Sequence, residues 1–180
     1  SNFFILVSPF IGIDALERVL GDATNVTILT SWKVEHLISG ASTIDLYPLC
    51  KVKGWKLFIN SRVHSKLYSD SLESCYVGSA NCTDRALFNP EGNHESMVYI
   101  PELTLEERVQ INELLSLSKL VNDDVYQVYR DLFSTIDPSD KTIPAEPDAS
   151  NFMSHYLTEL PATGSPESLF TYVSQGSSEG

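Results

Sequence analysis

The chain has 180 residues, a formal net charge of −12 and a mean hydropathy of −0.07. Hydrophobic residues make up 42% and charged residues 20%, which is the balance of a folded globular protein and excludes a wholly disordered chain. The apolar runs are far shorter than the roughly 20 residues of a membrane-spanning helix, and three widely spaced cysteines without a Cys-x-x-Cys pair indicate the cytoplasm rather than a secreted, disulfide-rich protein.

The first hundred residues alternate short apolar runs with helical patterns. Residues 3–7 are continuously apolar, which is typical of a buried strand, and residues 13–20 repeat apolar side chains at helical spacing before Gly21. Residues 25–30 predict a second strand, and residues 32–38 predict a helix. Further strands are predicted at 55–59, 63–68, 75–79 and 97–100. This order predicts an α/β fold with a mixed β-sheet flanked by helices.

The hydrophobic period becomes helical after residue 101. Thr104 and Glu107 form a capping box at the start of a helix predicted over residues 105–121, and a second helix is predicted over 124–133. From there the chain turns rich in Pro, Ser and acidic residues. We therefore predict a folded domain over residues 1–135. Residues 136–180 would form an acidic arm or linker that leads to a further domain, with 152–160 as its one helix candidate.

The negative charge is confined to the second half of the chain. Residues 1–90 hold eight acidic and eight basic residues, whereas residues 91–180 hold sixteen acidic and four basic ones. A protein that grips nucleic acid is normally basic along the gripping face. The distribution therefore weighs against a nonspecific DNA coat, and it leaves open a neutral catalytic half whose few cations gather in one place.

Candidate catalytic side chains concentrate in residues 63–83. His64 and Lys66 project from one face if they lie on a strand, because side chains two residues apart share a face. Ser79 and Asn81 repeat this stagger after the next predicted strand. If the two strands are neighbours, the four groups form a patch that suits a phosphoryl group. The cation and neutral donors would bind its oxygens, and a ring nitrogen could attack phosphorus.

This pattern resembles the signature of the phospholipase D superfamily, H-x-K-x(4)-D-x(6)-G-S-x-N. The matching residues are His64-x-Lys66 and Gly78-Ser79-x-Asn81. The family's aspartate would fall on Ser71, and Asp70 lies one residue earlier, so this chain departs from the signature at a turn. The resemblance covers about residues 1–100 and implies a phospholipase D-like catalytic domain.

A single H-x-K motif and the run Asn93-His94-Glu95 resemble the nuclease branch of that superfamily, including metal-independent restriction endonucleases. This resemblance implies a homodimer with both copies of His64 at one composite site. One His64 would form a phosphohistidine and the other would protonate the leaving oxygen. Lys66, Ser79 and Asn81 would bind the nonbridging oxygens, and neither a metal nor a cofactor would be required. Glu95 would accept the other ring N–H of the imidazole, although an ordinary surface carboxylate gives the same pattern.

A basic cluster precedes the motif. It consists of Lys51, Lys53, Lys56 and Arg62, with Trp55 among them. These residues could follow a nucleic-acid backbone while the indole stacks on a base. Lysines that protect an edge strand from aggregation give the same pattern, so both interpretations stand.

The sequence thus predicts a cytoplasmic, metal-independent endonuclease that cleaves DNA, as the nuclease domain of a restriction or defence enzyme whose target is recognised by an additional domain. Two alternatives remain. One is a lipid phosphodiesterase or phosphatidyl transferase, for which the sequence shows no amphipathic membrane helix. The other is a noncatalytic nucleic-acid-binding dimer that keeps the fold.

Overall fold

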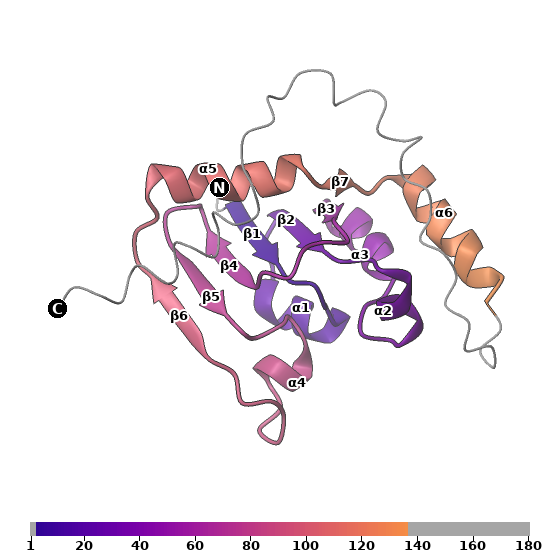
Figure 1. Cartoon of the computed structure of the whole chain (residues 1–180), viewed down its shortest axis with the longest axis horizontal. Coiled ribbons are helices and arrows are strands. Elements are labelled where there is room, and N and C mark those ends of the chain that lie inside the picture. The colour runs from indigo at the N-terminus through magenta and orange to yellow at the C-terminus, as the bar shows by residue number, and fades with distance from the viewer. Residues whose placement is uncertain (1–2, 137–180) are drawn as a thin grey trace. The chain divides into compact units, whose positions relative to one another are not determined.

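The computed structural model describes residues 3–136 (Figure 1). The predicted arm, with its helix candidate at 152–160, lies outside the described residues. The domain boundary at 135/136 therefore stays a prediction.

The described residues form a mixed sheet of seven strands in the order β6-β5-β4-β1-β2-β3-β7. β1 is parallel to β2 and β2 to β3, whereas the other neighbours are antiparallel. The strands are β1 (Phe3–Val7), β2 (Asn25–Thr30), β3 (Lys56–Ile59), β4 (Leu67–Asp70), β5 (Cys75–Gly78), β6 (Met97–Ile100) and β7 (Lys119–Leu120). The predicted α/β class with a mixed sheet is confirmed.

Helices cover both faces of this sheet (Figure 1). They are α1 (Ile13–Leu20), α2 (Val34–Ile38), α3 (Leu46–Lys53), α4 (Asp84–Leu87), α5 (Leu105–Ser116) and α6 (Asp123–Ser134). Among the described residues, no helix has the length and apolar character needed to cross a membrane.

Two helix predictions need correction. The helix predicted over 105–121 ends at Ser116, because Lys119 and Leu120 pair with β3 as the short strand β7. Helix α3 was not predicted. It contains Lys51 and Lys53, so the edge-strand interpretation, one of the two left open for the basic cluster, does not hold for these two lysines. Pro48 lies in its first turn, where a missing N–H breaks no intrahelical bond, so the proline that obscured the pattern is compatible with the helix.

The core divides between the two faces because side chains alternate along the strands. Leu6 of β1 packs on one side with Leu16 of α1, in a cluster that also includes residues of α3 and α6. Ile5 packs on the other side with Ile111 of α5. We call these the α1 face and the α5 face.

Candidate active site

The motif residues lie in loops at one end of the sheet. The strand predicted over residues 63–68 begins instead at Leu67, so His64 and Lys66 lie in the loop that enters β4. β4 and β5 are antiparallel neighbours, as expected for the patch. The Gly78 N–H donates to the carbonyl oxygen of Lys66 at 3.3 Å, which brings the start of β4 beside the end of β5.

His64 and Lys66 are in direct contact. The Lys66 Nζ donates to the backbone carbonyl of His64 at 2.8 Å and lies 3.4 Å from its Nδ1. The imidazole is exposed and the lysine partly buried. Burial lowers the pKa of Lys66, and the nearby Glu95 carboxylate opposes this shift. The pair thus places a cation beside a ring nitrogen at the surface.

Glu95 holds the loop that follows β5 against the loop that precedes β6. Its two oxygens accept from the Ser79 hydroxyl and, at 3.0 Å, from the Asn93 amide. The Ser79 and Ser96 backbones also bond, with the Ser79 N–H donating to the Ser96 carbonyl at 3.0 Å. The Ser79 and Asn93 donors, and Lys66 more weakly, lower the pKa of Glu95 despite some desolvation.

The position of Glu95 differs from the one expected. The resemblance implied that it would accept a ring N–H of His64, whereas the structure places it on Ser79 and Asn93, with His64 Nδ1 facing Lys66. Glu95 therefore acts here as a positioning residue for the Ser79 loop. Its charge still reaches the site through Lys66.

Gly78 allows the close packing at the end of β5. A Cβ atom at this position would lie 2.1 Å from the carbonyl oxygen of Ser96 and 2.9 Å from the Cα of Met97. Both are backbone atoms that cannot move without disturbing the β5–β6 pairing. A residue without a side chain is needed for Ser79 to reach its partners.

Ser8 anchors the loop that carries Asn81, and sequence reasoning missed this role. Its hydroxyl is fully buried at the end of β1, accepts from the Cys82 N–H at 3.0 Å and donates to the Phe10 carbonyl at 2.7 Å. The Asn81 Oδ1 lies 3.5 Å away. A sequence signal for this role is the position of Ser8, directly after the apolar run of residues 3–7.

The predicted basic cluster does not gather at this site. Lys51 pairs with Asp123 at 2.6 Å, and Lys53 lies 4.0 Å from Glu17. Both belong to α3, and Lys56 begins β3, at the end of that strand opposite the loop that leads to His64. Of the basic cluster, Arg62 is the one residue that lies in the loop leading to His64, and its side chain is exposed.

Trp55 is not placed to stack on a base. Only 6% of its surface is exposed, and its indole N–H donates to the Ala23 carbonyl at 2.8 Å. The ring belongs to the core cluster of the α1 face. Stacking by this residue was the wrong interpretation, because the fold buries the indole.

Within residues 3–136, no group of three or more His, Cys, Asp or Glu side chains is close enough to hold a metal ion. The motif histidine contacts a lysine, and Glu95 contacts neutral donors.

Comparisons with known proteins add one likeness. No family model matches the chain, and no curated protein matches it. Among solved structures it is similar to Nuc from Salmonella typhimurium, a phospholipase D family member. The TM-score is 0.49 and the identity 16%, over 68% of this chain and 82% of that one.

Proposed function

We propose that this chain is a phospholipase D-type phosphodiester hydrolase that cleaves DNA, without a metal ion, through a phosphohistidine on His64. The observation that supports it most is the meeting of His64 and Lys66 with Ser79 at one end of the sheet, through the bond from the Gly78 N–H to the Lys66 carbonyl. An imidazole, an ammonium and a hydroxyl held together at the surface suit a phosphodiester group.

The first step needs a free ring nitrogen. While the Lys66 ammonium faces Nδ1, the ring proton belongs on Nε2. A bound phosphodiester oxygen would draw the ammonium away, so Nδ1 could take the proton and Nε2 could attack phosphorus. The N–P bond then forms as the bond to the leaving oxygen breaks, and His64 of the partner subunit gives that oxygen its proton.

The second step reverses the roles. The partner subunit's His64, now neutral, removes a proton from water, and the water oxygen attacks phosphorus as the N–P bond breaks. The products are a phosphomonoester and the released hydroxyl. Because one imidazole must start neutral and the other protonated, the pH dependence belongs to the pair of histidines.

The test is cleavage of plasmid and single-stranded DNA in excess EDTA by wild type, His64→Ala and His94→Ala. His94 provides the matched control, because it is an exposed imidazole to which neither catalysis nor phosphate binding is assigned. We expect cleavage by wild type and by the control, and none by His64→Ala. Cleavage that stops in EDTA, or that persists in His64→Ala, would overturn the proposal.

Subunit mixing tests the composite site. If each site needs His64 from both subunits, activity in mixtures with His64→Ala falls as the square of the wild-type fraction, to about one quarter at equal amounts. If one chain carries a complete site, activity falls only to about one half. The linear result would reject the shared site while keeping the nuclease.

We extend the proposal to a cytoplasmic restriction or defence enzyme with an additional target-recognition domain, on the resemblance of the motif alone. The two alternatives make different predictions. A lipid phosphodiesterase or phosphatidyl transferase would turn over phospholipid vesicles, and a noncatalytic module would bind DNA equally well after His64→Ala without any turnover.

A further inference from the structure

Three tyrosines form a row across β4, β5 and β6. Tyr68 pairs directly with Tyr76, and Tyr76 pairs directly with Tyr99. Because directly paired residues project from the same face, the three rings lie side by side on the α1 face. The Tyr76 and Tyr99 ring centroids are 4.8 Å apart. Tyr68 is buried, whereas Tyr76 and Tyr99 are each 51% exposed. Two of the three rings are therefore accessible to a ligand.

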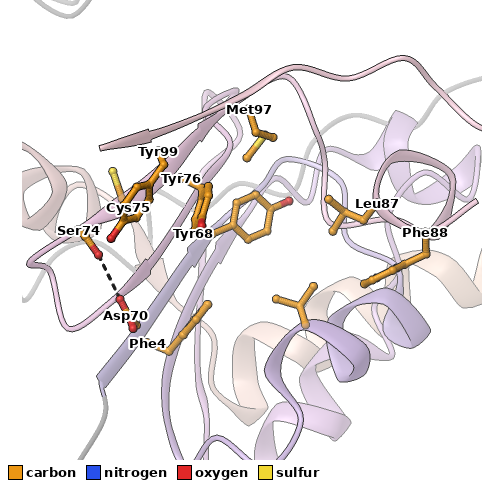
Figure 2. A pocket seen from close by; sticks show the side chains of 11 residues that line it. Phe4, Tyr68, Asp70, Ser74, Cys75, Tyr76, Leu87, Phe88, Met97 and Tyr99 are labelled. Atoms are coloured by element: carbon orange, nitrogen blue, oxygen red, sulfur yellow. Dashed lines mark hydrogen bonds between the residues drawn. The ribbon is translucent and has the colours of Figure 1, made fainter. Parts of the chain in front are cut away.

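This row forms one wall of a pocket of about 650 Å³ (Figure 2). Apolar side chains form the facing wall, among them Val19 of α1, Leu87 of α4 and Phe88 directly after α4. The Arg18 guanidinium packs over the Phe88 ring, with its carbon 3.6 Å from the ring centroid. The pocket therefore lies between the tyrosine row of β4, β5 and β6 and the ring of Phe88.

One end of the pocket is polar and acidic. Asp70 and Ser74 line it there, with the Ser74 hydroxyl donating to the Asp70 carboxylate at 3.4 Å (Figure 2). None of the residues that line the pocket is Lys or Arg. Another phosphate group of the substrate would lie beside the Asp70 carboxylate here, with no lining cation to balance the two negative charges. The amino group of an aromatic ring could instead donate a hydrogen bond to that carboxylate.

The pocket adjoins the candidate active site along the strands. Lys66 precedes Tyr68 by two residues, directly before β4 begins. Gly78, the last residue of β5, follows Tyr76 by two, a step of about 7 Å on an antiparallel strand. The Tyr68 hydroxyl donates to the Ala80 carbonyl at 2.9 Å, between Ser79 and Asn81. A group in the pocket therefore lies one short step from a phosphodiester at the motif.

We propose that this pocket receives an unpaired nucleobase next to the phosphodiester that is cleaved, so the preferred substrate is single-stranded nucleic acid; this rests on the proposed function. The tyrosine row offers flat aromatic surface for stacking, and Asp70 offers an acceptor for the exocyclic amino group of adenine, cytosine or guanine. A base inside a duplex is stacked and paired, and entering this pocket would require it to leave the helix.

The test compares Tyr76→Ala with Val98→Ala on three substrates: single-stranded DNA, the matching duplex, and an oligomer of abasic sugar-phosphate units. Val98 is the matched control, because it is 62% exposed on β6 beside Tyr99, and neighbouring residues of a strand face opposite sides of the sheet. Loss of stacking on one base should lower the kcat/KM for single-stranded DNA roughly ten- to a hundredfold in Tyr76→Ala. Cleavage of the abasic oligomer should be unchanged by either substitution.

The substrates separate the two proposals. Cleavage of the abasic oligomer that depends on His64 but not on Tyr76 supports the hydrolase, whatever happens at the pocket. Equal cleavage of single strand and duplex, or equal rates for Tyr76→Ala and Val98→Ala on single-stranded DNA, would overturn the nucleobase site. An equal loss on all three substrates in Tyr76→Ala would also overturn it, because it would show a structural role.

DNA binding can be measured even if no phosphodiester is cleaved. Fluorescence anisotropy of a labelled single-stranded oligodeoxycytidine should show an affinity that falls roughly tenfold or more in Tyr76→Ala and not in Val98→Ala. Phosphatidylcholine vesicles serve as the competing occupant. Vesicle binding or lipid turnover that depends on Tyr76, without such oligonucleotide binding, would assign the pocket to an acyl chain and overturn the proposal.

Discussion

Replacing Ser8 with alanine should weaken the attachment of the loop that carries Asn81 to the end of β1, where the Gly12 N–H also donates to the Cys82 carbonyl at 2.8 Å. The Ser8 hydroxyl is fully buried and is the acceptor for the Cys82 N–H, and it also donates to the Phe10 carbonyl. Alanine fills nearly the same space but has no polar atom. Both backbone groups lose this partner, and Cys82 is itself 0% exposed, so water cannot easily replace it.

The expected cost follows from these two bonds. A buried donor left without a partner costs about 1–3 kcal/mol, and a lost hydrogen bond of ordinary strength costs about 1 kcal/mol. We therefore expect the free energy of unfolding of Ser8→Ala to fall by about 2–4 kcal/mol. At roughly 2–4 °C per kcal/mol for a domain of this size, the Tm should fall by roughly 4–16 °C.

Urea unfolding followed by circular dichroism measures this change, with Ser116→Ala as the control. Ser116 is exposed and its hydroxyl donates at 2.7 Å to a carbonyl of its own helix, so its loss should change the stability by less than about 0.5 kcal/mol. If Ser8→Ala unfolds within about 0.5 kcal/mol of wild type, the loop is held by other contacts and the argument from the buried hydroxyl is wrong.

Three further experiments test separate parts of the structure. Trp55→Phe removes the indole donor to Ala23 and should lower the free energy of unfolding by about 1–3 kcal/mol while leaving single-stranded DNA affinity unchanged; a loss of affinity at unchanged stability would restore the stacking role. The carboxyl pKa of Glu95, followed by NMR titration, should lie below the ordinary 4.5 and should rise in Ser79→Ala. Because the pKa of Glu95 is lower in the folded state, the carboxylate stabilises the fold at pH values above its unfolded-state pKa, and this contribution is lost as the pH falls through its folded-state pKa. An unshifted pKa in wild type would contradict the hydrogen-bond network around Glu95. Thr104→Ala breaks the capping box of α5 and should cost about 1 kcal/mol in thermal or urea unfolding, whereas Thr104→Ser should cost much less, and equal losses in both would contradict a capping role.

Local patterns predicted most of the regular elements. Residues 3–7, 25–30 and 97–100 form strands with the expected bounds, and residues 13–20 form the expected helix. Each is specified by hydrophobic period within a few residues of itself. The capping box at Thr104 is also local, and both of its hydrogen bonds are present.

The errors fall where distant contacts override a local pattern. The segment that includes Leu120 continues a helical period, yet it pairs with Phe58 of β3 because an unpaired sheet edge is available there. Trp55 reads as an aromatic residue among surface lysines, and only the packing of α1 and α3 against the sheet shows that its ring is in the core.

The sequence by itself determined the chemical groups and their stagger: a histidine two residues before a lysine, and a serine two residues before an asparagine. Only the tertiary structure decided which groups meet. Glu95 bonds to Ser79 rather than to His64, and three tyrosines line one pocket, because these contacts depend on how β4, β5 and β6 pair. Register is set by the turns between strands and by the cores on both faces, and a shift of one residue would turn every side chain to the other face.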